Sequence, residues 1–119
     1  MATILIVEDD FIQAAALELA VMQLGHEPLP LAASVSQALE LLAKATPDVA
    51  LVDLLLRDED AGCVIAELAK RSVPLAVLTA AGQEVDRRFK EHLVIHKPAD
   101  SETVAGAIEL LRWRRDAID

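Results

Sequence analysis

Short apolar runs with no polar residues in alternation are the feature that most limits what this chain can fold into. Four such runs, at residues 3–7, 49–52, 74–78 and 93–95, consist almost wholly of aliphatic and β-branched side chains. A strand that is apolar at every position needs cover on both faces, as in parallel sheets flanked by helices. Residues 27–31 form a weaker fifth run, whose two prolines favour the edge of a sheet.

Segments of helical character separate these runs. The expected helices cover residues 11–24 and 61–70, a polar stretch at 83–91, and segments that begin near Ser34 and Asp100. Ser34 followed by Gln37 is a capping-box pattern, and Asp100 is a good N-cap. In the last helix the inward positions are Val104, Ala107, Ile108 and Leu111. Each strand is therefore followed by a helix.

Five strand–helix units predict an α/β fold: a doubly wound five-stranded parallel sheet with helices on both faces. Five strands suit the flavodoxin-like order 2-1-3-4-5. The 119 residues fit one domain over 1–119, and 54% hydrophobic residues argue against disorder. In such sheets the functional site lies beyond the carboxyl ends of the strands.

Charge and composition exclude several classes of protein. A net charge of −9 argues against nucleic acid as the main partner, because such a field repels phosphates. No apolar run reaches 18 residues, so we expect no membrane span. The first strand follows the N-terminus without a signal sequence, and we expect a cytoplasmic protein. Cys63 is the only cysteine, which excludes a disulfide framework; we expect it to be buried.

Polar residues follow the predicted strands where function is expected. Glu8, Asp9 and Asp10 follow the first, Asp53 the third, Thr79 the fourth and Lys97 the fifth. Clustered carboxylates repel one another, and an all-oxygen site suits Mg²⁺ better than zinc. With Thr79 and Lys97 nearby, the site could hold a phosphoryl group, and Asp53 is the plausible nucleophile. Singly, these residues could be loop residues or caps, and Asp10 could cap the first helix.

At these residues the chain resembles the response-regulator receiver domains of two-component signalling. The resemblance spans the whole length and rests on residues 4–10 and 48–54, Thr79-Ala80 and Lys97-Pro98. It implies a phosphoacceptor at Asp53, direct Mg²⁺ ligation by Asp9 and Asp53, a backbone carbonyl ligand from Leu55, a water-mediated contact from Glu8, and phosphoryl contacts from Thr79 and Lys97. It also implies a cis Lys97–Pro98 bond.

The chain departs from the family pattern at several positions. Arg57 replaces a common proline, and Val94 stands where the switch aromatic usually lies. Residues 73–79 and 94–98 are similar to a stand-alone subgroup that pairs with alphaproteobacterial-type kinases. That subgroup often has Gly-Tyr-Gly after the threonine, where this chain has Ala80-Ala81-Gly82.

The expected function is therefore that of a phosphoacceptor. Asp53 would take a phosphoryl group from a histidine kinase or a histidine phosphotransfer protein and switch contacts with a downstream protein target. Such a domain catalyses only its own phosphorylation and dephosphorylation, and is not otherwise an enzyme. The alternatives are a small flavodoxin-like enzyme and a pseudo-receiver that takes no phosphate. Absence of Tyr disfavours a flavin protein, and Leu55 replaces the second aspartate of a haloacid-type phosphatase.

Two apolar features could mark contact surfaces. The first helix has an inward stripe of Ala14, Leu17, Val21 and Leu24, and a second stripe of Ile12, Ala16 and Leu19. The second stripe is either covered by neighbouring helices or exposed as a dock for the kinase helix. Trp113 lies about 180° around the last helix from Val104, at an interface or at a frayed terminus.

Overall fold

The computed structural model describes residues 1–56, 59–80 and 92–118. Its central sheet is parallel and comprises β1 (Thr3–Val7), β2 (Glu27–Pro28), β3 (Val49–Asp53), β6 (Leu75–Thr79) and β7 (Leu93–His96). The strand order is β2-β1-β3-β6-β7. Because β6 and β7 are the fourth and fifth predicted strands, this is the predicted order 2-1-3-4-5.

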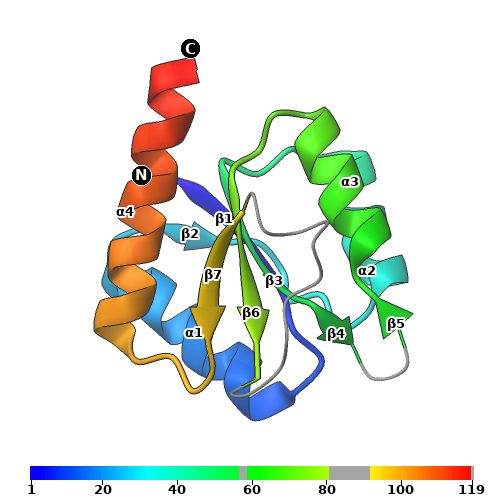
Figure 1. The fold of residues 1–119 in the computed structure, drawn as a ribbon, viewed down its shortest axis with the longest axis horizontal. Helices are drawn as coiled ribbons and strands as arrows, with labels where there is room; N and C mark the ends of the chain where they lie inside the picture. The colour runs from blue at the N-terminus through cyan, green and yellow to red at the C-terminus, as the bar shows by residue number, and fades with distance from the viewer. Residues whose placement is uncertain (57–58, 81–91, 119) are drawn as a thin grey trace.

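Helices cover both faces of the sheet. In Figure 1, α1 (Phe11–Gln23) and α4 (Ser101–Ile118) lie on one side, and α2 (Val35–Lys44) and α3 (Gly62–Lys70) on the other. The predicted doubly wound α/β fold is thereby confirmed. None of these described helices is long and apolar enough to cross a lipid bilayer.

Side chains that cap the helices fix where three of them begin. Asp10 Oδ1 accepts hydrogen bonds from the backbone N–H groups of Ile12 and Gln13, at 3.0 and 3.1 Å. Ser34 Oγ accepts from Gln37 N–H at 3.1 Å, and Asp100 Oδ1 accepts from a backbone N–H in the first turn of α4 at 2.8 Å. These bonds satisfy donors that a helix start leaves without partners. The three predicted caps are correct.

The strands are buried on both faces, as their uniform apolar sequence requires. Leu5, Val7, Ala50 and Val52 pack in the layer under α2 and α3, together with Val64 and Leu68. Their sequence neighbours Ile4, Ile6, Val49 and Leu51 pack in the layer under α1 and α4, with Val21 and Ile108. Successive residues of a strand point to opposite faces, which accounts for this division. The sheet is therefore held rigidly between two apolar layers, and its strand ends are fixed in position.

Three expectations are wrong. Leu24 is 37% exposed because α1 ends just before it. Cys63 is exposed, because Val64, Ile65 and Leu68 occupy the inward positions of α3. The edge strand β2 covers two residues rather than 27–31.

A short antiparallel hairpin after β3 was not predicted at all. It pairs β4 (Leu55–Leu56) with β5 (Glu59–Asp60). The predicted helix at 83–91, the Arg57 departure and Ala81-Gly82 lie outside the described residues.

Candidate functional site

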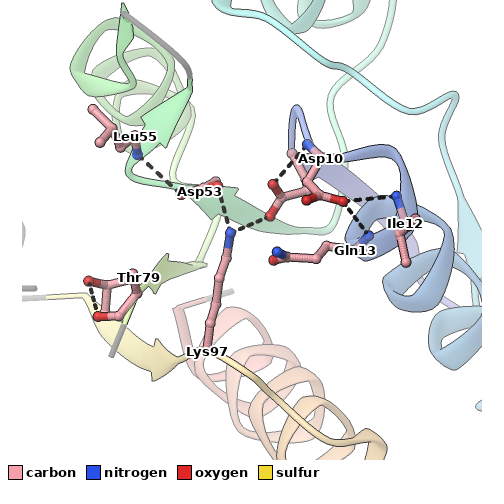
Figure 2. Close-up of polar contacts among 9 residues, drawn as sticks. Asp10, Ile12, Gln13, Asp53, Leu55, Thr79 and Lys97 are labelled. Carbon is pink, nitrogen blue, oxygen red and sulfur yellow. Dashed lines mark hydrogen bonds and ion pairs between the residues drawn. The ribbon is translucent and has the colours of Figure 1, made fainter. Parts of the chain in front are cut away.

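The parallel register places the ends of four neighbouring strands side by side. Val7 is paired with Val52, Asp53 with Leu78, and Thr79 with His96. The residues that follow or end these strands therefore meet at one edge of the sheet. Figure 2 shows Asp53, Thr79 and Lys97 reaching this edge from β3, β6 and the end of β7, with Asp53 and Lys97 directed toward one another.

Lys97 joins the carboxylates of two strands. Its Nζ lies 2.7 Å from Glu8 Oε2 and 2.7 Å from Asp53 Oδ2. The Glu8 and Asp53 side chains are only 1% and 8% exposed, so both ion pairs are shielded from solvent. The other oxygen of each carboxylate accepts a backbone N–H: Glu8 Oε1 from Asp10, and Asp53 Oδ1 from Leu55, both at 3.1 Å. The Asp53 carboxylate is thus held in one orientation.

The electrostatics of the site reflect burial and crowding of charge. Burial raises the pKa of Glu8 to about 7, despite the opposing hydrogen bond from Lys97, and the nearby Asp53 carboxylate adds to the rise. Burial also lowers the pKa of Lys97, but its hydrogen bonds to both carboxylates outweigh this and hold the pKa above its usual value. Lys97 therefore stays charged, while Glu8 takes up a proton near neutral pH.

The acidic residues fit a hard divalent cation. Glu8, Asp9 and Asp53 each offer one carboxylate oxygen, and these three oxygens all lie within 4.8 Å of one another. One ammonium cannot neutralise three carboxylates, so the cluster has an excess of negative charge. Oxygen-only donors with room for water suit Mg²⁺ better than a metal that prefers nitrogen or sulfur.

Thr79 and Lys97 are fixed to each other through the backbone. Lys97 N–H donates to the Thr79 carbonyl at 2.7 Å, and Thr79 is fully buried at the end of β6. The Thr79 hydroxyl lies 3.5 Å from the Ala80 carbonyl. The Lys97–Pro98 peptide bond is cis, as the resemblance implied. The structure therefore brings every predicted site residue to one edge of the sheet.

Two features of the site were not foreseen from the sequence. The first is the Glu8–Lys97 ion pair, whose partners are 89 positions apart. The second is the donation by Leu55 N–H to Asp53, since only the carbonyl of Leu55 was expected to take part. Spacing gives no signal for either contact; only the predicted convergence of strands 1, 3 and 5 could have suggested the ion pair.

A groove runs from this site along α1. Its volume is about 720 Å³, with Glu8 and Lys97 among the residues of its wall. Ile12, Ala16 and Leu19 line it from α1, and Pro98, Ala99 and Ser101 line it from the segment that leads into α4. Ile12 is 79% and Leu19 55% exposed. The second apolar stripe of α1 is therefore open, and cover by neighbouring helices is wrong for the part of the chain described.

Comparison with known proteins gives a family and a fold. The family model described as the response regulator receiver domain matches residues 4–109. Over 88 residues the chain is 33% identical to the transcriptional regulatory protein AfsQ1 of Streptomyces coelicolor, an alignment that covers 72% of this chain and 38% of that protein. The chain thus spans well under half the length of this curated relative.

Two solved structures illustrate the similarity. The solution structure of SdrG from Sphingomonas melonis Fr1 superposes with a TM-score of 0.84 at 33% identity, covering 93% of this chain and 96% of that one. The receiver domain of a modulated diguanylate cyclase from Desulfovibrio desulfuricans G20 also gives a TM-score of 0.84. Its identity is 24%, over 100% of this chain and 99% of that one, so it supports the fold alone.

Proposed function

Because this chain belongs to the response regulator receiver domain family, we propose that it receives a phosphoryl group on Asp53 and passes the signal on through protein contacts. One observation carries the proposal: Asp53 is a buried carboxylate held between a lysine and two further acids at the switch point of the sheet. We propose that residues 1–119 act as a single receiver domain in the cytoplasm, with a protein as downstream target.

In this mechanism Asp53 is the nucleophile. Its carboxylate oxygen forms a bond to phosphorus while the bond from phosphorus to the donor's histidine nitrogen breaks, and the imidazole leaves with that electron pair. The hydrogen bond from Leu55 N–H to Oδ1 orients the attacking group. Lys97 Nζ, now 2.7 Å from Oδ2, pairs with the incoming phosphoryl oxygens, and the Thr79 hydroxyl donates to another.

The remaining acids hold the metal in this proposal. Asp9 and Asp53 would hold Mg²⁺ directly, Leu55 would hold it through its backbone carbonyl, and Glu8 through water. When bound, Mg²⁺ would supply positive charge that offsets the charge on the phosphoryl oxygens. Beyond its own phosphorylation and dephosphorylation, the domain catalyses no reaction.

Incorporation of labelled phosphate from acetyl phosphate tests the function. We expect uptake only with Mg²⁺, and release of the label by hydroxylamine, which cleaves acyl phosphates but not phosphoserine or phosphothreonine. A protein that stays unlabelled at millimolar Mg²⁺ would be a pseudo-receiver. A label resistant to hydroxylamine would exclude an aspartyl phosphate.

The donor docks, we propose, in the groove beside α1. Ile12, Ala16 and Leu19 form an apolar strip that leads to the acidic site, so a helix lying on it can place a phosphohistidine next to Asp53. A histidine kinase or a histidine phosphotransfer protein presents such a helix. The acidic end of the groove and the apolar strip would together select the partner.

Substitution of Leu19 separates docking from chemistry. Leu19→Arg buries an unpaired charge in the interface, so transfer from the cognate kinase should fall by at least about tenfold while labelling by acetyl phosphate persists. Leu39→Arg is the matched control, because Leu39 is 38% exposed on α2 and lies outside the groove. Equal loss of both reactions in Leu19→Arg would contradict docking at this site, and so would full retention of both.

Val94 replaces the usual switch aromatic. It is partly buried and packs against the apolar layer under α2 and α3. A β-branched side chain has few rotamers and cannot swing as an aromatic ring does. We propose that the response to phosphate uses the segment 80–91 instead, most of which lies outside the described residues. We also propose that the chain belongs to the stand-alone subgroup, on the resemblance of residues 73–79 and 94–98 to it.

A further inference from the structure

A buried histidine, His26, lies just past the end of α1 and has no part in the phosphoacceptor site. Gly25, with a φ of +83°, ends the helix in the left-handed conformation that glycine adopts without strain. His26 N–H then donates to the Val21 carbonyl at 3.1 Å, as in a Schellman motif. This motif turns the chain back toward the core, and the His26 side chain is only 5% exposed.

Both ring nitrogens of His26 have partners on other elements. Nδ1 lies 3.1 Å from the backbone nitrogen of Ala2, and Nε2 lies 3.4 Å from Glu109 Oε1 in α4. Because the Ala2 N–H is a donor, Nδ1 accepts, so Nε2 carries the ring proton and donates to Glu109. In agreement with this direction, the hydrogen bond from His26 holds the pKa of Glu109 below its usual value. One side chain thus joins the start of β1, the end of α1 and the middle of α4.

The helices that this side chain joins form the two walls of the groove beside the phosphoacceptor. One wall follows α1 as far as Gln23, three residues before His26. Ser101 and Val104 of α4 belong to the other wall, and Glu109 lies about 7.5 Å further along that helix. Figure 1 shows α1 and α4 on the same face of the sheet. The His26–Glu109 contact therefore joins the two walls just past the end of the groove that is remote from the acidic site.

Polar contacts between α4 and α1 are otherwise lacking. Among residues 1–56, 59–80 and 92–118, no other hydrogen bond or ion pair joins α4 to α1 or to the turn that follows α1. The rest of the contact is apolar, and the layer under the two helices includes the small side chains of Ala20 and Ala107. Apolar contact is not directional, so it does not by itself define one spacing of the helices.

We propose that His26 is a positioning residue for phosphotransfer, which holds α4 at one distance from α1 and so keeps the groove open for the donor's helix. This role rests on the proposed function, because it requires a donor that docks in the groove. Without the bond to Glu109, α4 moves toward the small side chains of α1 and the groove narrows. A donor then binds only the fraction of molecules whose groove is open, so its apparent affinity falls in proportion to that fraction.

The contact itself should contribute little to the stability of the fold. A separation of 3.4 Å is long for a hydrogen bond, and the Glu109 side chain is 60% exposed. Glu109→Ala should therefore leave the melting temperature nearly unchanged, so its effect on docking is separable from unfolding. Glu109→Gln is the rescue variant, because its amide oxygen still accepts from Nε2. His26→Asn is the complementary variant, because its shorter side chain can accept from Ala2 but cannot reach α4.

Spin labels on the two helices measure their spacing in the protein alone. Ala15→Cys and Glu102→Cys provide exposed positions outside the groove wall, and Cys63→Ser removes the native thiol. Double electron–electron resonance should give one narrow distance distribution in this background and in Glu109→Gln. Glu109→Ala and His26→Asn should each give a shorter mean distance. A distribution that stays unchanged in both variants would overturn the proposal.

Phosphotransfer kinetics test the consequence for docking. With the phosphorylated cognate kinase as donor, KM should rise at least about threefold in Glu109→Ala and in His26→Asn, with kcat unchanged and Glu109→Gln close to wild type. Glu40→Ala is the matched control, because it removes the same charge from the exposed side of α2. Labelling by acetyl phosphate should be equal in all of these proteins, since Asp53 and its neighbours are untouched.

A role in folding alone would lower the melting temperature of His26→Asn and leave KM unchanged in both variants, which would overturn the positioning role. An equal rise of KM in Glu40→Ala would also overturn it, because the effect would then come from net charge. A wild type that acetyl phosphate does not label would instead contradict the proposed function, and that outcome is distinct because it does not involve His26.

Discussion

The two ends of β3 each carry an aspartate that faces a cation, yet they differ in what they can do. At the amino end, Asp48 pairs with Arg115 at 2.6 Å and accepts two hydrogen bonds from Thr3, the backbone one at 2.8 Å. One carboxylate meets one cation, and both side chains are about a third exposed. At the carboxyl end, Lys97 serves two buried carboxylates, with Asp9 as a third acid nearby.

This comparison shows that an excess of negative charge, rather than the mere presence of charged side chains, marks the functional end of β3. The Asp48 cluster is neutral and satisfied, and it holds α4 against β1. The Asp53 cluster has a net negative charge and a glutamate whose pKa is about 7. A divalent cation would relieve the repulsion between these carboxylates. With the cation bound, the cluster could accept an anionic group beside Asp53.

Replacing the cationic side chain at each end of β3 should give the largest difference in the free energy of unfolding. Lys97→Met leaves Glu8 and Asp53 buried without their partner, and the free energy of unfolding should fall by about 2–4 kcal/mol, somewhat less than for a pair that cannot take up a proton. Arg115→Met affects a pair that is partly solvated, and the loss should be at most about 1 kcal/mol. Urea denaturation at pH 8 without Mg²⁺ measures both. Equal losses would show that the two ends are energetically alike.

The second largest difference should be in stabilisation by Mg²⁺, which should depend on the acids at the carboxyl end of β3 and not on Asp48. The ion binds the native cluster only, so at about a hundred times its dissociation constant it should stabilise the wild type by about 2.7 kcal/mol. Asp9→Asn should lose this gain, whereas Asp48→Asn should keep it, because Asp48 lies at the other end of the strand. Thermal melts with and without the ion provide the measurement, and an unaltered response in Asp9→Asn would place the metal elsewhere.

A smaller effect should appear with pH. Burial raises the pKa of Glu8 to about 7 from 4.5, so the folded protein binds this proton more tightly than the unfolded chain does. Without Mg²⁺, its contribution to stability is therefore present at low pH and is lost as pH rises through about 7, which amounts to about 2 kcal/mol between pH 5.5 and 7.5.

Glu8→Gln isolates this contribution, since the neutral amide does not titrate. The carboxyls of Glu67, Asp100 and Glu109 have lowered pKa values and lose stabilisation only below the usual carboxyl range, outside the window. The difference in unfolding free energy between wild type and Glu8→Gln should hence change with pH in this window. A difference that is constant across it would mean that Glu8 is ionised throughout.

The sequence predicts the side chains at the carboxyl end of β3 better than the Asp48–Arg115 contact at its amino end, and the reason is physical. Uniformly apolar strands dictate a parallel sheet, and parallel strands all end at the same edge. Glu8, Asp53, Thr79 and Lys97 follow from strand boundaries alone. The Asp48–Arg115 contact depends on how the last turns of α4 pack, and no motif or spacing in the sequence indicates that contact.

The other differences between the predicted and the observed structure arise where the sequence pattern is short or lies at the end of an element. The β4–β5 hairpin has two residues on each side, too few to show an alternating pattern. Leu24 continues the apolar stripe of α1 in sequence, but the helix ends before it can turn inward. Cys63 is apolar enough for the core, yet its place on α3 is set by the stronger inward stripe of its neighbours. Periodicity thus predicts faces well in the middle of an element and poorly at its ends.

Locating the phosphoryl group tests the central claim most directly, because Asp48 and Asp53 flank the same strand. After reaction with acetyl phosphate and Mg²⁺, reduction with borohydride converts an aspartyl phosphate into homoserine, which mass spectrometry assigns to a position. The account predicts the conversion at Asp53, with Asp48 unmodified and Asp53→Asn unreactive. Conversion at Asp48, or at another carboxylate while Asp53 stays intact, would contradict it.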